Sequence, residues 1–222
     1  WAGAMGMMQF IPTTFRDYAI DFDNDGNKDL WTNKSDALSS AAHYLSRHGW
    51  RWGEPIVMEV STKNGFDYSL AENSQKMVSE WLELGITQMP NHENLKIYEN
   101  LKAKLIVPSG HKGPKILIFK NFDVIKKYNN STSYALAVTS FAHALNERTA
   151  LTAEWPRTDK LLSLTDRVSA QKKLKELGYK LGLIDGVIGP NSRKAIREWQ
   201  KDVGIPEDGY LEKNILDLLL KQ

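Results

Sequence analysis

Helical periodicity dominates the first two thirds of the chain. Apolar residues recur every three or four positions over about 36–48, 73–84 and 133–146, the spacing that places them on one face of an amphipathic helix. Asp36 suits the N-cap of the first of these helices. A shorter helix is predicted to start near Thr13, directly after a proline. The body of the chain is therefore predicted to be mainly helical.

Three short apolar runs between these helices are predicted to be strands. They cover 56–60, 101–107 and 115–119, and Pro and Gly residues that favour turns separate the last two. We therefore expect a small β insertion over about 53–120 within the helical body. The predicted fold class is mainly α, of the α+β kind.

The last part of the chain has a different pattern of short helices and turns. Residues 166–222 contain three short helical patterns, punctuated by the turn-forming pairs Asp185–Gly186 and Asp208–Gly209, and each pair is followed by a helix. Residues 150–165 lack periodicity. The pattern predicts a first domain over 1–149, a linker over 150–165 and a small three-helix module over 166–222.

Composition removes several classes of function. Among 222 residues, 29 basic and 27 acidic side chains give a net charge of +2, which does not favour a nucleic-acid partner. The absence of cysteine excludes disulfides, thiolate zinc sites and a cysteine nucleophile. No apolar run reaches the roughly 18 residues that a membrane span needs. Because the chain opens on Trp1-Ala2-Gly3 without Met, we expect a fragment or a processed product.

An acidic loop follows the first helix. Asp21, Asp23 and Asp25 occupy alternate positions, Gly26 comes next, and Asn27 follows it. This is the front half of an EF-hand-like loop, in which alternate carboxylates converge on a hard cation and Gly permits the sharp turn. The sequence therefore predicts a structural Ca²⁺ site, with Mg²⁺ less favoured because it tolerates fewer protein ligands.

The back half of this loop departs from the EF-hand pattern. Thr32 stands where a bidentate carboxylate is expected, and Asp36 is the nearest acid that could complete the ligand set after an enlarged loop. An acidic turn that caps the following helix without metal is the alternative.

Several motifs, in order, resemble a known family. The segments are AGAMGMMQFIP at 2–12, the acidic loop, HGW at 48–50 and KYNNSTSYA at 127–135. They are similar to segments of the B-type lytic murein transglycosylases of Gram-negative bacteria, the glycoside hydrolase family 103 type, over about residues 1–150. The tail resembles the three-helix peptidoglycan-binding module. The matching residues there are Gln171, Leu174, Leu177, Gly178, Asp185, Gly186, Gly189, Ala195, Ile196, Trp199, Gln200 and Gly209.

The resemblance implies a lysozyme-like helical domain that acts on peptidoglycan glycan strands. Such enzymes cleave the MurNAc–GlcNAc β-1,4 bond without water and leave 1,6-anhydro-MurNAc ends. One Glu protonates the leaving oxygen and then serves as base while the 6-hydroxyl closes the ring. That Glu is expected upstream of residue 1, so this chain by itself is expected to lack the catalytic acid. The remaining glutamates, including Glu59 and Glu72, match no motif and are expected on the solvated surface.

Substrate-binding residues follow from the resemblance where the motifs match. Gln9, Tyr44, Tyr128, Asn129 and Tyr134 are the candidates. Three of them have a simpler explanation that stays open: Gln9 as a buried amide that bonds the backbone, Tyr44 as a core residue, and Asn129 as a helix cap. Trp50, Trp52 and Trp81 are expected to be packing residues and not platforms for sugar rings, and Trp199 is expected in the core of the tail.

In the tail module, Asp185 and Ser192 are expected to form a shallow groove for the stem peptide or the glycan. The resemblance further implies the periplasm of a Gram-negative bacterium, with an outer-membrane anchor in a full-length form, and peptidoglycan as partner. A separate N-terminal fragment is a second partner to consider. The rival function is a non-catalytic peptidoglycan-binding protein or remnant. An upstream segment that carries a Glu on an amphipathic helix would distinguish the two.

Overall fold

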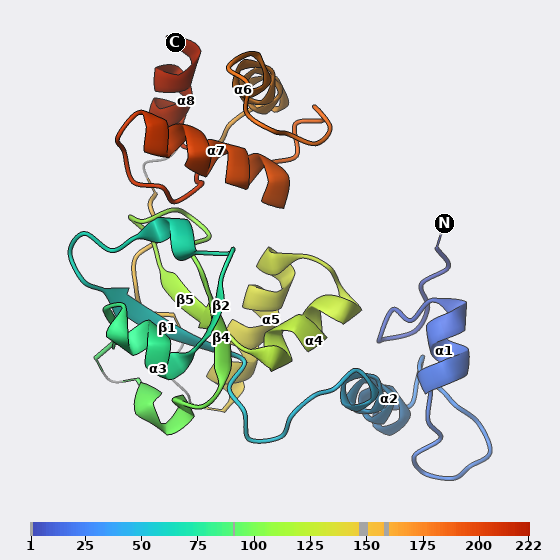
Figure 1. Ribbon diagram of the computed structural model, residues 1–222. Helices are drawn as coiled ribbons and strands as arrows, with labels where there is room; N and C mark the ends of the chain where they lie inside the picture. The colour runs from blue at the N-terminus through green and yellow to red at the C-terminus, as the bar shows by residue number, and fades with distance from the viewer. Residues whose placement is uncertain (1, 91, 147–150, 158–159) are drawn as a thin grey trace. The chain divides into compact units, whose positions relative to one another are not determined.

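The structure, a computed structural model, describes residues 2–90, 92–146, 151–157 and 160–222. The chain divides into two compact units that interleave along the sequence (Figure 1). The first unit joins Trp1–Ile56 to Lys120–Thr139, and the second joins Val57–Phe119 to Ser140–Gln222. The sheet insertion and the C-terminal helices thus belong to the same unit.

The first unit is helical. Its elements are α1 (Pro12–Tyr18), α2 (Lys34–Arg47), α4 (Lys120–Tyr128) and the first part of α5 (Thr132–Leu145). Its core gathers the buried residues Phe10, Ala19, Leu30, Ala37 and Tyr44. Pro opens α1 at the position where its missing N–H costs nothing, as the sequence indicates.

Helix α2 begins two residues before the predicted start. Asn33 is its N-cap, and the side-chain oxygen of Asn33 accepts the N–H groups of Ser35 and Asp36. The prediction that Asp36 caps this helix is therefore wrong. Asp36 lies in the first turn of the helix and is fully buried, so its carboxylate is free to bond the preceding loop instead.

Helix α4 was not predicted from the sequence. It follows strand β5 (Lys115–Ile118) after one residue, so its apolar residues Phe122, Val124 and Ile125 extend the apolar run of the strand. The polar Asn121 in its first turn is fully buried and forms three hydrogen bonds with the backbone of Arg51 and Glu54. This helix was missed because a local pattern does not separate a strand from a helix that follows it directly.

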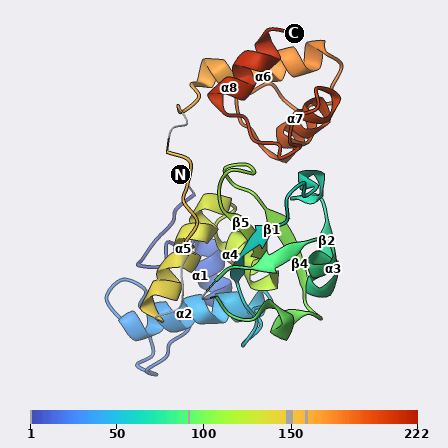
Figure 2. The same ribbon diagram turned by 90° about the vertical axis from the view of Figure 1, so that its left-hand side faces the viewer.

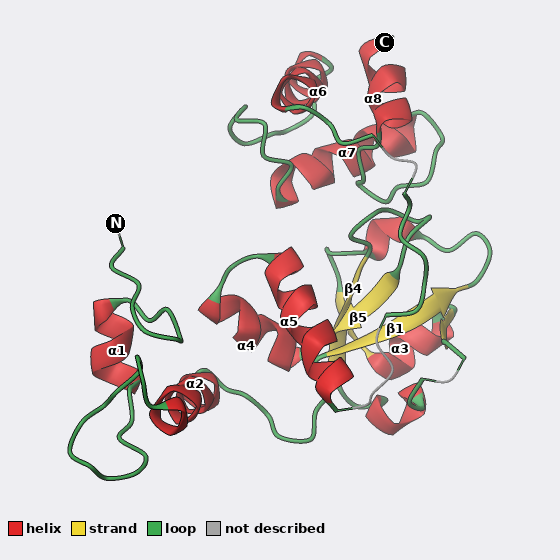
Figure 3. Ribbon diagram, turned by 180° about the vertical axis from the view of Figure 1, so that it is seen from behind, coloured by secondary structure: helices red, strands yellow, loops and turns green. Residues whose placement is uncertain are grey.

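The second unit contains a five-stranded antiparallel sheet (Figure 3). The strands, in the order β2-β4-β5-β1-β3 across the sheet, are β1 (Val57–Thr62), β2 (Gln75–Met77), β3 (Ile86–Gln88), β4 (Lys102–Ile106) and β5. The three predicted strands correspond to β1, β4 and β5. Residues 75–77, predicted as helix, pair instead with β4, and the helix α3 is confined to Val78–Glu83.

The sheet and α3 enclose a core that includes Trp81, which is fully buried and donates its indole N–H to the Ala103 carbonyl. Trp81 is therefore the packing residue that the sequence indicates. Trp52, in the first unit, is not: its side chain is 96% exposed.

Glu59 corrects another expectation. It lies on β1 and is only 2% exposed, not on the solvated surface. Its carboxylate accepts the N–H groups of Thr152 and Ala153 at 2.6 and 2.9 Å, and the Thr152 hydroxyl at 2.8 Å. A buried carboxylate is tolerated when it is fully hydrogen-bonded. Glu59 therefore fastens part of the predicted linker to the sheet. The rest of that linker includes residues 150, 158 and 159, which lie outside the described residues.

Three helices follow in the C-terminal part (Figure 2): α6 (Leu164–Glu176), α7 (Pro190–Asp202) and α8 (Lys213–Leu220). Ser163 and Asp166 form a reciprocal capping box at the start of α6. The helices close on a small core centred on Trp199, Leu174 and Leu216, each at most 1% exposed. The three predicted helices and the core position of Trp199 are confirmed.

Candidate functional site

The Gly-rich segment before α1 folds into a tight turn. Met5 and Phe10 exchange both backbone hydrogen bonds, at 2.9 and 3.1 Å, and close the turn. Gly6 has a φ of +67°, and a Cβ atom at this position would lie 2.7 Å from the Leu30 carbonyl oxygen. Glycine is required here both by the backbone conformation and by the close approach of the acidic loop.

Gln9 stands at the tip of this turn. Its own φ is +51°, a left-handed conformation that non-glycine residues rarely adopt. Its side-chain amide donates to the Gly6 carbonyl at 2.9 Å and is exposed. The simpler explanation of a buried amide therefore does not apply. Because the side chain is exposed, the amide lies at the surface of the turn.

Tyr44 lies on α2 at the centre of an aromatic cluster. Its ring stacks on His48 at a centroid distance of 4.0 Å and contacts Phe10 and Tyr128 at 5.8 and 5.3 Å. Its hydroxyl donates to the Lys127 carbonyl at 2.9 Å. At 8% exposure Tyr44 is a core residue, as the simpler explanation had it, and its edge supports the Gly-rich turn through Phe10.

Tyr128 links the last turn of α4 to the Gly-rich segment. Its hydroxyl donates to the Met8 carbonyl, next to Gln9 in the sequence. Burial, together with the neighbouring Tyr134 and Tyr44 hydroxyls, raises the pKa of Tyr128 to about 12. The hydroxyl therefore stays protonated at neutral pH and holds the turn as a neutral donor.

Asn129 follows α4 and is exposed. The capping residue of the next helix is Ser131, whose hydroxyl accepts the N–H of Tyr134 at 3.2 Å. The helix-cap explanation for Asn129 is therefore wrong. The Tyr128–Met8 bond and the aromatic contacts bring Tyr44, Tyr128 and the turn that carries Gln9 into one region. Asn129 directly follows Tyr128 in the chain, and Tyr134 lies in the first turn of α5.

His48 also belongs to this region, although the sequence analysis did not assign it a role. Its ring lies between Tyr44 and Tyr18, with Tyr18 at a centroid distance of 5.1 Å, and its Nδ1 contacts the Tyr44 carbonyl at 2.8 Å. The signal was present in the HGW motif, but helical spacing alone does not tell a stacking histidine from a surface one.

The acidic loop brings three of its five predicted ligands together. One carboxylate oxygen from each of Asp21, Asp23 and Asp36 lies within 4.8 Å of the others. Asp25 is not in this group, and its carboxylate accepts the Asn27 N–H at 2.7 Å. Asp36 of α2, predicted to complete the ligand set, therefore lies beside the first two acids of the loop.

Backbone N–H groups already balance much of this negative charge. The two oxygens of Asp36 accept the N–H groups of Phe22 and Asp29 at 2.8 and 2.9 Å, and Asp21 accepts that of Gly26 at 2.9 Å. The donor set consists of oxygens only, the kind of ligand that Ca²⁺ prefers. The residues thus fit a hard cation, while the loop also has hydrogen bonds of its own.

In the C-terminal module the two predicted residues meet at Gln171. The amide of this buried side chain donates to Asp185 Oδ1 at 3.3 Å and to Ser192 Oγ at 3.2 Å. Ser192 is 5% exposed, whereas Asp185 is exposed. Hydrogen bonds from Val187 and Gln171 lower the pKa of the Asp185 carboxyl, which is therefore ionised at neutral pH. Ser192 lies behind the turn, and Asp185 is the member that faces solvent.

Family models match most of the chain. The model described as the transglycosylase SLT domain matches residues 1–143, and the model described as a putative peptidoglycan binding domain matches residues 163–219. Because the first model matches residues 1–143, well over half of the chain, the chain belongs to the transglycosylase SLT family. The mainly helical, lysozyme-like fold expected from the sequence is confirmed.

Individual relatives agree with this assignment. Membrane-bound lytic murein transglycosylase B of Escherichia coli (strain K12) is 33% identical over 153 residues, which are 65% of this chain and 38% of that protein. SltB3 of Pseudomonas aeruginosa, solved in complex with NAG-anhNAM-pentapeptide, is 44% identical, with a TM-score of 0.91 over 99% of this chain and 59% of that chain. The Escherichia coli enzyme Slt35, solved in complex with calcium, is 28% identical, with a TM-score of 0.52 over 66% of this chain and 45% of that chain.

The chain therefore spans about two fifths of the curated relative and about three fifths of the SltB3 structure. No helix among the described residues is both long enough and apolar enough to cross a membrane.

Proposed function

We propose that this chain is part of a peptidoglycan lytic transglycosylase. The reaction is the non-hydrolytic cleavage of the MurNAc–GlcNAc β-1,4 bond, in which the MurNAc 6-hydroxyl attacks C1 and the GlcNAc oxygen leaves with a proton. The observation that carries the proposal is the family match over residues 1–143 together with the built Gly-rich turn. The anhNAM group bound in the relative SltB3 is the end that this reaction leaves.

The residues of the first unit bind and orient glycan in this proposal. Gln9 presents its amide at the tip of a turn that Tyr128 and Gly6 hold in place. Tyr134 and Asn129 add further polar contacts along α5 and the loop before it, and Tyr44 supports the turn from below. Neutral phenols suit such a surface, because they can bond sugar hydroxyls without attracting ions.

No described Glu is assigned the role of acid and base. Glu59 bonds the backbone at 152–153, and Glu72 forms ion pairs with Arg193 and Arg197 at 2.7 and 2.8 Å. Both expectations of a solvated surface position are thus wrong. A catalytic carboxyl must be free to exchange a proton with the glycosidic oxygen. Glu59 and Glu72 are not, because their carboxylates are held by the contacts just described.

Incubation with purified sacculi followed by mass spectrometry of the soluble products tests the activity. Release of fragments ending in 1,6-anhydro-MurNAc supports the transglycosylase. Release of reducing-end fragments would contradict it, since those arise by hydrolysis. Pelleting with sacculi without any release of fragments would favour the second candidate, a non-catalytic peptidoglycan binder. The separate core of the C-terminal module supports this candidate.

The C-terminal module, proposed over residues 166–222, would hold the protein on peptidoglycan. Asp185 and Ser192 mark its binding turn. The proposed setting is the periplasm of a Gram-negative bacterium, which the name of the membrane-bound relative supports. An outer-membrane anchor belongs to the same proposal for a full-length form.

We also propose that the acidic loop binds Ca²⁺ as a structural ion. Asp21, Asp23 and Asp36 would supply the first oxygens, and Asp25 and Asn27 would complete the set. The calcium complex of Slt35 supports the choice of metal. When bound, the ion would tie the loop to α2 and so support the Gly-rich turn that packs on Leu30.

A further inference from the structure

The C-terminal module contains the same turn twice. In the first copy, between α6 and α7, the Gln171 side-chain oxygen accepts the Gly186 N–H at 2.7 Å while its amide donates to Asp185 Oδ1. The same Oδ1 accepts the Val187 N–H at 2.8 Å. Gly186 has a φ of +75°, and α7 begins four residues after it.

The second copy, between α7 and α8, repeats each of these contacts. The Gln200 side-chain oxygen accepts the Gly209 N–H at 2.8 Å, and its amide donates to Asp208 Oδ1 at 3.0 Å. Asp208 Oδ1 accepts the Tyr210 N–H at 2.8 Å. Gly209 has a φ of +68°, and α8 again begins four residues later. The two turns therefore present the outer oxygen, Oδ2, of their aspartates in the same way.

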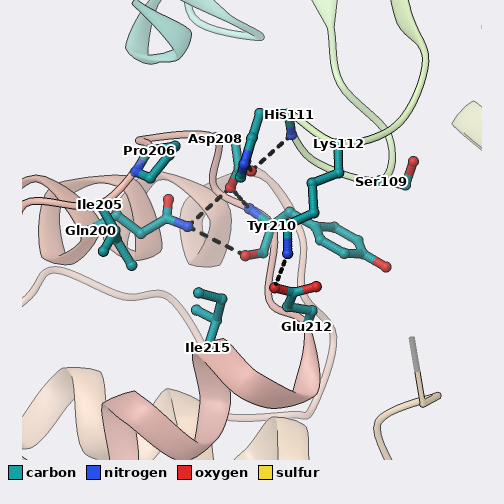
Figure 4. A pocket seen from close by; sticks show the side chains of 10 residues that line it. All are labelled: Ser109, His111, Lys112, Gln200, Ile205, Pro206, Asp208, Tyr210, Glu212 and Ile215. Carbon is teal, nitrogen blue, oxygen red and sulfur yellow. Dashed lines mark hydrogen bonds and ion pairs between the residues drawn. The ribbon is translucent and has the colours of Figure 1, made fainter. Parts of the chain in front are cut away.

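The second copy is occupied by another part of the chain. Asp208 is only 4% exposed, because the turn after β4 lies against it. The backbone N–H of His111 donates to Asp208 Oδ2 at 2.9 Å, and His111 Nδ1 contacts the same oxygen at 2.6 Å (Figure 4). A peptide segment thus fills this turn by donating a backbone N–H to the outer carboxylate oxygen, with the His111 ring beside it.

The residue before His111 shows which stereochemistry such a segment needs. Gly110 has a φ of +73°, and an L-residue Cβ there would lie 2.7 Å from Asp208 Oδ2 and 2.9 Å from Tyr210 Cβ. L-residues avoid this φ, whereas D-residues favour it as the mirror image. In a D-residue, Cβ replaces the other Cα hydrogen of glycine and therefore points away from Asp208 Oδ2 and Tyr210 Cβ. Gly110 therefore occupies a place that suits glycine or a D-residue.

The first copy is open. Asp185 is exposed, and among the described residues the groups that hydrogen-bond its carboxylate belong to the module itself. The apolar side chains on either side, Leu183 and Val187, are 82% and 64% exposed. An ionised carboxylate between two exposed apolar side chains suits a peptide that offers an N–H group and a small apolar side chain.

We propose that the Asp185–Gly186 turn binds a peptide amide N–H that directly follows a D-residue, in the way that the Asp208–Gly209 turn binds His111 after Gly110. This inference rests on the proposed peptidoglycan function, and it selects the stem peptide over the glycan as the ligand of the module. Cell-wall peptides contain D-residues, so the stereochemistry at Gly110 agrees with that choice.

Two synthetic peptides that differ at one stereocentre test the proposal: acetyl-Ala-D-Ala-Ala amide and its all-L isomer. They are titrated into the ¹⁵N-labelled full chain, with the amide signals of Gly186 and Val187 as the readout. We expect the D-containing peptide to shift these signals and to bind at least about tenfold more tightly than the all-L isomer, because a lost charge-assisted hydrogen bond and a collision both weaken the latter. Equal binding of the two isomers would overturn the proposal, as would shifts confined to other residues.

Asp185→Asn is the matched variant. Its Oδ1 can still accept the Val187 N–H and the turn is retained, but an amide replaces the outer oxygen. We expect about tenfold weaker binding of the D-containing peptide, with unchanged thermal stability. Glu176→Gln, which removes another exposed carboxylate of the module, should bind as the unchanged chain does. Full binding by Asp185→Asn would contradict the inference.

NAG-NAM-pentapeptide and the NAG-NAM disaccharide separate this inference from the proposed function. Shifts at Gly186 with the pentapeptide alone are expected. Binding of the bare disaccharide at the turn, together with pelleting on sacculi, would leave the peptidoglycan function standing and reject the peptide as its ligand. Binding of D-containing peptides without pelleting or product release would support the turn and reject the proposed function.

Discussion

At the scale of single residues, the Gly-rich turn depends on one close approach. A Cβ atom at Gly6 would lie 2.7 Å from the Leu30 carbonyl oxygen, so any side chain there must displace the acidic loop. Gly26 also has a positive φ, of +92°, but nothing lies within 4 Å of a Cβ atom there. Substitutions at these two glycines therefore distinguish the cost of backbone strain from the cost of a steric collision.

We predict that Gly6→Ala lowers the free energy of unfolding by about 2–4 kcal/mol, and Gly26→Ala by about 1 kcal/mol. Denaturant unfolding of the two variants measures the difference. Gly6→Ala should also lose activity on sacculi, since Gln9 moves with the turn. Similar destabilisation by both variants would mean that the collision with Leu30 is relieved at little cost.

Tyr128 provides a pH-dependent prediction. Its pKa of about 12 in the folded protein lies above the ordinary value of 10.0, so the folded state favours the protonated phenol. This contribution to stability is fully present below pH 10 and is lost as the pH rises from about 10 to 12. Unfolding free energies at pH 8, 10 and 11 should fall more steeply for the unchanged chain than for Tyr128→Phe.

The same variant also loses the bond to the Met8 carbonyl. We expect Tyr128→Phe to be about 1–2 kcal/mol less stable at pH 8 because that carbonyl loses its donor. Tyr134→Phe, on the neighbouring helix, serves as the control. An alkaline slope in Tyr128→Phe as steep as that of the unchanged chain would mean that another group causes it.

At the scale of elements, the acidic loop and α2 form one unit through Asp36. We predict that Ca²⁺ raises the Tm of a metal-stripped sample, and that the rise disappears in Asp21→Asn. Asp17→Asn in α1, which removes an exposed carboxylate outside the loop, should keep the full rise. A Tm independent of Ca²⁺ in the unchanged chain would exclude the calcium proposal.

The C-terminal helix α7 and the residues before β2 are joined by Glu72. Arg197 is 4% exposed, and its Nη2 lies 2.8 Å from Glu72 Oε2, while Arg193 bonds both oxygens of Glu72, at 2.7 and 2.8 Å. A buried guanidinium without its carboxylate is unfavourable. We predict that Glu72→Gln costs about 2–3 kcal/mol, measured by denaturant unfolding, whereas the exposed Glu83→Gln changes stability by less than about 0.5 kcal/mol.

At the scale of the whole molecule, the C-terminal helices have a core of their own, centred on Trp199, and a capping box at Ser163. We predict that residues 160–222 fold as an isolated fragment with helical circular dichroism and a cooperative thermal transition. Its Tm should lie below that of the same residues in the full chain, since contacts such as those of Glu72 and His111 are then missing. An unstructured fragment would mean that those contacts are essential for folding.

Much of the fold could be predicted because it rests on local pattern. Helices α2, α5, α6 and α7 have apolar residues at helical spacing, and the strands β1, β4 and β5 are apolar runs between turn residues. The short strands β2 and β3 could not be predicted, since three residues carry too little periodicity and only pairing with β4 and β1 defines them. Helix α4 was hidden by the strand it follows.

The candidate site divides in the same way. By itself the sequence predicted that Gln9, Tyr44 and Tyr128 serve one site, because ordered motifs resemble one family. It also predicted a five-ligand cation site from the spacing of the acidic loop, and of those ligands Asp21, Asp23 and Asp36 lie together. Tertiary structure alone decided that Glu59 is buried against the backbone at 152–153, that the half-buried Glu72 pairs with two arginines, and that His111 fills the Asp208 turn. These contacts join residues 93 to 121 positions apart along the chain. Burial and pairing at such separations depend on how the chain packs, and no local spacing encodes them.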